Sequence, residues 1–141
     1  MIKKFAGVSI AVKDLDTAVK KYEAVLGVKS TPADPKDFAV PGLAGASLKV
    51  GDVLINLLTS TQPGTSVANF LETRGEGVFL LSLEVDDADQ ATKELGAKGV
   101  KFVSPEPISF SAGKVNFGHP KSMHGVQWEF AQLAPDAKFN I

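Results

Sequence analysis

The sequence predicts an α+β fold built from two βαβββ modules. Two observations predict it: the chain repeats itself at a constant spacing, and each copy starts with a strand pattern that runs into a helix pattern. Val12 and Asp14 recur as Val85 and Asp87, in both cases 73 positions later (85 − 12). The chain has 141 residues, about twice that spacing, so two modules account for nearly all of it.

Each predicted module opens with a strand, at 5–12 and at 78–85, because these segments are rich in β-branched and apolar residues. A helix follows, with apolar positions at helical spacing. These positions are Leu15, Ala18, Val19, Tyr22 and Leu26 in the first helix, and Ala88, Ala91, Leu95 and Ala97 in the second. Asp14 or Asp16 can cap the first helix, while Gly27 and Gly99 stand where helix C-termini favour glycine.

Three shorter strands are predicted to complete each module, at 28–31, 46–50 and 53–59, and then at 101–103, 114–118 and 126–131. Residues 66–74 are predicted to form a short connecting helix. The predicted organisation is therefore a single domain, with module one at 1–60, a linker helix at 61–76, module two at 77–133 and a tail at 134–141.

Side chains alternate between the two faces of a strand, which divides each predicted strand into two sets. One set is uniformly apolar and is predicted to pack under the helices: Val8, Ile10, Val12, Val53, Ile55, Leu57, Phe79, Leu81, Leu83, Val85, Val126, Trp128 and Phe130. The other face mixes small, apolar and polar side chains, as small-molecule sites do. The candidate ligand-binding residues there are Gly7, Ser9, Ala11, Ser47, Lys49, Leu54, Asn56, Leu58, Leu80, Ser82, Asn116, Gln127 and Glu129.

Composition argues against several classes of partner. Fifteen basic and sixteen acidic residues give a net charge of −1, so no basic excess is available for nucleic acid. No apolar run approaches the ~20 residues of a membrane span, which predicts no membrane partner. The chain has no cysteine, which fits a cytoplasmic location. His119 and His124 are predicted to lie in a solvated loop rather than to form a metal pair.

Five stretches that cover most of the chain carry a family resemblance: VSIAVKDLDTAVKKYEAVLGVK, VGDVLINLLTS, SVANFLETRGEG, EVDDADQATKELGAKGVKF and FGHPKSMHGVQWEF. They resemble the vicinal oxygen chelate superfamily of glyoxalases, extradiol dioxygenases and bleomycin-resistance proteins, and methylmalonyl-CoA epimerases above all. The resemblance implies the vicinal oxygen chelate fold, in which the two modules form a curved mixed sheet with a cleft. It also implies a homodimer.

The resemblance further implies metal ligands on the first and last strand of each module, at positions 7, 56, 80 and 129. These positions hold Gly7, Asn56, Leu80 and Glu129. Glycine and leucine have no donor atom, whereas a catalytic divalent ion takes three or more protein ligands. We therefore expect no metal and no other cofactor. The segment 38–45, where an epimerase would carry a second glutamate as base, has no carboxylate, which argues against two-base epimerisation.

Two functions from different classes follow from these residues. The main interpretation is a metal-free binding protein that holds an apolar organic ligand in the cleft. The alternative is a metal-independent isomerase, lyase or cyclisation enzyme that uses Glu129 as acid or base. An inactive paralogue that partners an active homologue is a third, weaker interpretation. Under the first two, burial of Glu129 away from positive charge predicts a raised pKa.

Overall fold

The fold comes from a computed structural model that describes residues 1–135. The predicted tail at 134–141 therefore lies, beyond Pro135, outside the described residues. The elements in chain order are β1 (Ile2–Ala11), α1 (Leu15–Leu26), β2 (Thr31–Pro32), η1 (Pro35–Asp37), β3 (Leu43–Val50), β4 (Val53–Ser60), α2 (Ser66–Arg74), β5 (Gly77–Val85), α3 (Ala88–Ala97), β6 (Ile108–Phe110), β7 (Gly113–Gly118), η2 (Pro120–Ser122) and β8 (Trp128–Leu133).

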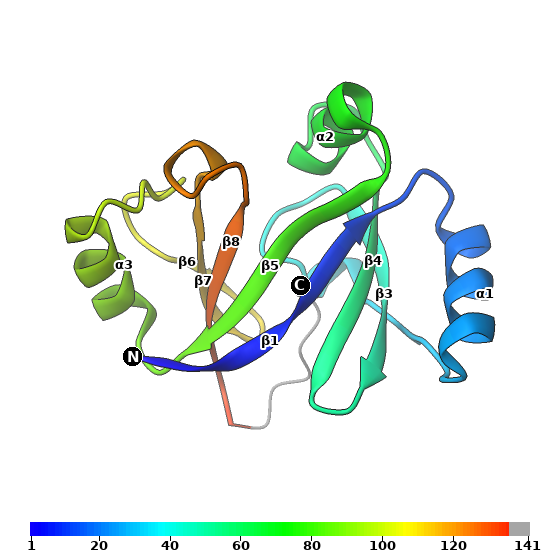
Figure 1. The fold of residues 1–141 in the computed structure, drawn as a ribbon, viewed down its shortest axis with the longest axis horizontal. Coiled ribbons are helices and arrows are strands. Elements are labelled where there is room, and N and C mark those ends of the chain that lie inside the picture. Colours follow the sequence, from blue (N-terminus) through cyan, green and yellow to red (C-terminus); the bar gives the residue numbers. More distant parts are fainter. Residues whose placement is uncertain (136–141) are drawn as a thin grey trace.

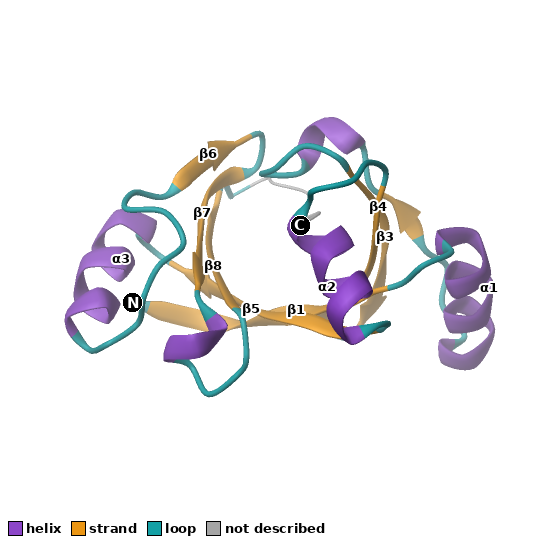
Figure 2. Cartoon of the chain, turned by 90° about the horizontal axis from the view of Figure 1, so that it is seen from above, coloured by secondary structure: helices purple, strands orange, loops and turns teal. Residues whose placement is uncertain are grey.

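The eight strands form one mixed sheet in the order β2-β3-β4-β1-β5-β8-β7-β6. The first strands of the two halves, β1 and β5, pair antiparallel at the centre, while β1 with β4 and β5 with β8 run parallel. Seen from above, the sheet curls so that its two outer arms face each other across a concave side, and α2 lies at one end of that side (Figure 2). The predicted α+β fold with a curved mixed sheet is confirmed.

Two helices cover the outer face of the sheet, one on each arm (Figure 1). The apolar stripe of α1 packs on Val12, Leu48 and Leu57, and α3 packs with Val85 and Phe130. An aspartate caps the N-terminus of each helix, and for α1 it is Asp14, one of the two residues predicted. The Asp14 side chain accepts a hydrogen bond from the Thr17 N–H at 2.9 Å, and the Asp87 side chain caps α3 in the same way.

Three strand predictions are wrong. The strand predicted at 28–31 is absent at 28–30, and β2 comprises only Thr31 and Pro32. The segment 101–103 forms only an isolated bridge between Phe102 and Gly118, and the strand beside β7 is β6, further along the chain. Pro105 and Pro107 cannot donate to a ladder, so pairing resumes only at Ile108. The last strand, β8, begins at Trp128, two residues later than predicted.

Phe79 lies on the concave side rather than under a helix, contrary to the prediction from alternation. The β1–β5 ladder shifts register between Ser9, which pairs with Leu80, and Ile10, which pairs with Val78. Phe79 is the extra residue at this shift, and its side chain packs in the concave cluster against Leu80. Irregular pairing of this kind re-aims side chains and cannot be seen in a two-residue period.

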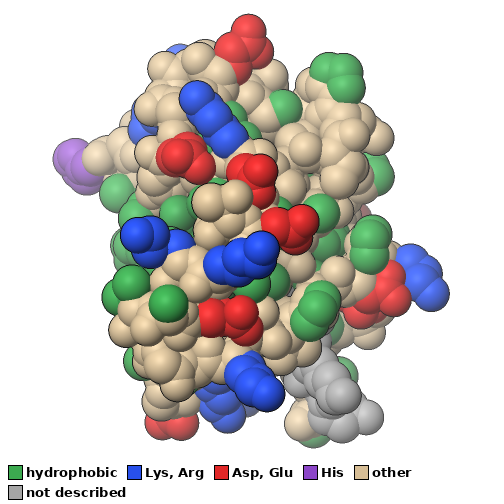
Figure 3. All heavy atoms as spheres, turned by 90° about the vertical axis from the view of Figure 1, so that its right-hand side faces the viewer, with side chains coloured by type: hydrophobic (Ala, Val, Ile, Leu, Met, Phe, Trp, Pro, Cys, Tyr) green, Lys and Arg blue, Asp and Glu red, His purple; other side chains and the backbone are tan. Residues whose placement is uncertain are grey.

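The surface carries mixed charge. On the face that lies to the right in Figure 1, acidic and basic side chains are interspersed (Figure 3). Among the described residues, no helix is both long enough and apolar enough to span a membrane.

Candidate functional site

Four polar side chains lie buried on the concave face of the central strands. They are Ser9 on β1, Asn56 on β4, Ser82 on β5 and Glu129 on β8, each at most 2% exposed. Register explains why they share this face: Ser9 pairs with Asn56, and Ser82 pairs with Glu129. The internal repeat therefore places polar groups from both halves side by side on adjacent strands.

The surroundings of Glu129 favour the protonated, neutral form of its carboxyl group. Its Oε1 accepts a hydrogen bond from Ser82 Oγ at 2.7 Å. Burial disfavours the charged form and raises the pKa of Glu129 to about 7, while the Ser82 hydrogen bond acts in the opposite direction. The predicted rise in this pKa is confirmed. At neutral pH the carboxyl group is poised between its two protonation states, as acid/base catalysis requires.

An inner cavity of 280 Å³ opens directly onto Glu129. Apart from this carboxyl, Ser66 and Gln127, its walls are apolar. They comprise Phe38, Ala39, Val40, Leu43, Leu58, Phe79, Leu80, Val103, Ile108 and Phe117. A single titratable group in an apolar chamber experiences little screening by water, so its charge state has a large effect on a bound molecule.

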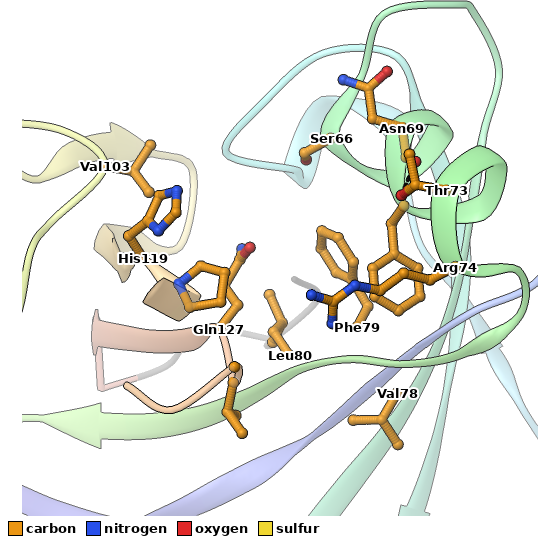
Figure 4. Close-up of a pocket in the computed structure, with 14 residues that line it drawn as sticks. Ser66, Asn69, Thr73, Arg74, Val78, Phe79, Leu80, Val103, His119 and Gln127 are labelled. Atoms are coloured by element: carbon orange, nitrogen blue, oxygen red, sulfur yellow. Dashed lines mark hydrogen bonds between the residues drawn. The ribbon is translucent and has the colours of Figure 1, made fainter. Parts of the chain in front are cut away.

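An outer cavity of 580 Å³ adjoins the inner one, since both are lined by Ser66, Phe79, Leu80, Val103 and Gln127. Figure 4 shows the α2 side chains, with Arg74, on one side and His119 and Gln127 on the other, with Leu80 between them. The Arg74 guanidinium lies 5.9 Å from the centre of the Phe70 ring, which packs edge-on against Phe79. The outer cavity is thus more polar than the inner one and carries a cation.

The structure divides the sequence-predicted site residues into groups. Leu58, Leu80, Gln127 and Glu129 line the inner cavity, and Ala11 is buried in the same cluster. Ser9, Asn56 and Ser82 are buried on the same face of the sheet but line neither the inner nor the outer cavity. Ser47, Lys49 and Leu54 instead line a separate cavity of 730 Å³. Its walls also include Lys3, Lys4 and Lys29.

The placement of Asn116 in the cleft is wrong. Its Nδ2 donates to Thr92 Oγ1 at 3.3 Å and to the Ser104 carbonyl at 3.0 Å, and its Oδ1 accepts from the Phe117 N–H. The β7–β8 register decides this, because it pairs Asn116 with Phe130 and Phe117 with Glu129. Asn116 therefore faces α3, and Phe117 takes the cavity position.

The residues at positions 7, 56, 80 and 129 do not fit a divalent ion. No group of three histidine, cysteine or acidic side chains capable of holding a metal occurs among residues 1–135. Gly7 also could not gain a ligand by simple substitution, because a Cβ there would lie 2.2 Å from the carbonyl oxygen of Leu54. Close approach of β1 and β4 requires glycine at this point.

Several cavity residues escaped the sequence reasoning. Phe38 and Val40 lie in the connection before β3, and Leu43 is the first residue of β3. The alternation of side chains along a strand does not predict which way residues of a connection point. Phe79 depends on the register shift. Arg74, by contrast, lies in the stretch SVANFLETRGEG that carried part of the family resemblance, so that stretch was a usable signal.

Comparison with known proteins agrees with this architecture. The family model described as Glyoxalase/Bleomycin resistance protein/Dioxygenase superfamily matches residues 8–117. The chain is 32% identical over 133 residues to a mitochondrial methylmalonyl-CoA epimerase of Dictyostelium discoideum, covering 93% of this chain and 79% of the relative. It is 32% identical to an ethylmalonyl-CoA/methylmalonyl-CoA epimerase of Cereibacter sphaeroides, with 94% and 100% covered. A solved methylmalonyl-CoA epimerase in complex with methylmalonyl-CoA and NH4+ superimposes with a TM-score of 0.84 at 28% identity, covering 96% of this chain and 97% of that one.

These relatives correct the main functional interpretation. A binding protein without catalysis is wrong, because chains about 30% identical over most of the length are enzymes. The alternative that included an isomerase agrees with them better. The matched model spans well over half of the chain, and the fold and the internal repeat agree with it. The chain therefore belongs to the glyoxalase/bleomycin resistance protein/dioxygenase superfamily.

Proposed function

We propose that this protein is a metal-independent isomerase that removes and returns a proton on a carbon next to a carbonyl group, with Glu129 as the acid/base. The observation that carries the proposal is the buried Glu129 carboxyl, with a pKa of about 7, facing an apolar cavity. A base with a pKa near the working pH combines a large ionised fraction with useful proton affinity.

An acyl thioester of coenzyme A is the proposed class of substrate. The solved relative holds methylmalonyl-CoA, and the two cavities suit a molecule with a small apolar end and a large polar one. The acyl group would occupy the inner cavity beside Glu129. The polar remainder would leave through the outer cavity, past Arg74 and His119, where a cation and neutral donors can contact anionic groups.

One carboxyl group limits the stereochemistry. The nearest acid to the 38–45 segment is Asp37, which accepts a hydrogen bond from Ser111 Oγ at 2.8 Å and does not line the inner cavity. Glu129 would thus take the proton and return it on the same face of the substrate. A proton shift between two carbons, or epimerisation after the intermediate turns in the cavity, uses one base in this way.

The test is hydrogen exchange in D2O. The protein is incubated with a panel of acyl-CoA thioesters that differ in acyl size, and deuterium at the α-carbon and any rearranged product are followed by mass spectrometry and NMR. Glu129→Gln should lower exchange ~10²-fold or more. Glu84→Gln, the same change on the separate lysine-lined cavity, is the matched control and should leave exchange intact. Exchange that survives Glu129→Gln, or its absence from the wild type, would contradict the proposal.

We further propose a cytoplasmic homodimer. Between α1 and α3 the outer face of β1 and β5 is not covered by a helix (Figure 2). The apolar side chains there include Phe5, which is 41% exposed, and Val78, which is 57% exposed. A second copy burying this strip would remove it from water. Light scattering should give twice the chain mass, and Phe5→Glu should yield monomers; a monomeric wild type would overturn the dimer.

A further inference from the structure

Among residues 1–135, two buried polar side-chain atoms have no hydrogen-bond partner: Ser9 Oγ and Asn56 Nδ2. Ser9 is fully buried and Asn56 is 2% exposed. Burying a donor without a partner is unfavourable, so such atoms are rare unless a ligand or water accepts the hydrogen bond. Both atoms belong to paired residues on neighbouring strands, so they form one local pair of donors.

The pair lies on the same face of the sheet as Glu129. In sheet order, β4 and β1 carry the pair, β5 carries Ser82 and β8 carries Glu129. Two strand spacings and an offset of two residues along β5 thus separate the backbone at Ser9 from the backbone at Glu129, about 12 Å in all. Asn56 is one strand further away. The curl of the sheet brings the side chains closer. Leu80, the cross-strand neighbour of Ser9, lines both the inner and the outer cavity.

We propose that Ser9 and Asn56 are the oxyanion-binding residues of this enzyme, and that a substrate carbonyl oxygen reaches them when Leu80 turns aside. This inference rests on the proposed function. Glu129 takes the α-proton, the C–H electron pair forms the carbon–carbon π bond, and the carbonyl π electrons move to oxygen. That oxygen accepts hydrogen bonds from Ser9 Oγ–H and Asn56 Nδ2–H. The same electrons return when Glu129 gives the proton back.

Ser9 and Asn56 would stabilise the oxyanion, which the residues at positions 7, 56, 80 and 129 cannot do through a bound metal ion. Neutral donors fixed in a water-poor site stabilise a developing oxyanion without reorganising, and removing one such donor typically lowers turnover by ~10²–10³-fold. Asn116, which is buried to a similar degree, differs from Asn56 because both its amide nitrogen and its amide oxygen have hydrogen-bond partners.

The first arm of the test measures thermal unfolding of Ser9→Ala, Asn56→Leu and Asn116→Leu. Asn116→Leu is the matched control, since it removes an asparagine of equal burial that is fully bonded. It should lower the melting temperature by about 5 °C or more. Ser9→Ala and Asn56→Leu should leave it unchanged or raise it, because they remove atoms with no partner. A loss as large as that of Asn116→Leu would assign the pair to the structure and overturn the proposal.

The second arm measures α-carbon exchange with the thioester panel. Ser9→Ala and Asn56→Leu should each lower turnover ~10²-fold with KM little changed, because the oxyanion exists only after proton removal. Exchange that depends on Glu129 but not on these two residues would refute the oxyanion role alone. A wild type that exchanges nothing would refute the proposed function and this role together. Ser9→Ala removes a single atom, so it decides the matter even if Asn56→Leu does not fold.

Discussion

Glu129→Gln should change how stability depends on pH. The pKa of Glu129 rises from 4.5 to about 7 on folding because burial penalises the charged carboxylate. Between these values the unfolded chain has released the proton and the folded chain still holds it, so the wild type loses stability as pH rises through this window. Each pKa unit corresponds to 1.36 kcal/mol, which makes the total loss about 3 kcal/mol. Glutamine does not titrate, so the variant lacks this loss.

The assay is urea unfolding of both proteins at a series of pH values from 4 to 8. The free energy of unfolding of the variant minus that of the wild type should rise by about 3 kcal/mol across the series and level off above pH 7. Taking the difference cancels all other titrating groups. A difference that stays flat would show that the carboxyl is solvated in the folded protein, and the acid/base proposal would lose its basis.

Three further changes have definite outcomes. Ser82→Ala removes the hydrogen bond that favours the charged form, so the pH at which exchange activity is half-maximal should move upward from about 7; a downward shift in the pH–rate profile would contradict this. Introducing histidine at both Gly7 and Leu80 should lower the melting temperature without stoichiometric metal by elemental analysis, since a side chain at position 7 collides with the β4 backbone. Asp87→Ala should lower the free energy of unfolding by about 1 kcal/mol through loss of the α3 cap, measured by urea unfolding, and no change would argue against the cap.

The repeat made most of the fold predictable. Constant spacing fixed the correspondence of the two halves, and the α1 stripe and its Asp14 cap followed from local chemistry. The predicted strands are less accurate where strand pairing is irregular or where a strand lies at the edge of the sheet. β6 is short and flanked by prolines, and its position depends on what β7 leaves unpaired. The position of such a strand depends on tertiary contacts, which the periodicity of the sequence does not show.

The site was predictable in its centre and less so at its rim. Ser9, Asn56 and Glu129 follow from strand parity in regular ladders. Leu80 follows the same parity because it stands on the regular side of the register shift in β5. Asn116 is predicted to face the cleft, but the β7–β8 register places its neighbour Phe117 on that face instead. The walls that come from connections depend on packing between distant segments, as the contact of Phe38 with the Leu58 and Leu80 cluster illustrates.

The absence of donor atoms at positions 7 and 80 changes the chemistry of Glu129 as well as removing two ligands. A carboxylate bound to a divalent cation is held ionised by the charge of the ion, so it serves as a ligand and not as a proton carrier at neutral pH. The side chains at positions 7, 56 and 80 do not fit such a cation beside Glu129, and the Ser82 hydrogen bond only partly offsets the effect of burial on the pKa of Glu129. The same position in the same strand is thereby suited to proton transfer. In the proposed mechanism Ser9 and Asn56 take the place of the metal ion in stabilising the substrate oxygen. They donate hydrogen bonds to that oxygen, which a general base cannot do.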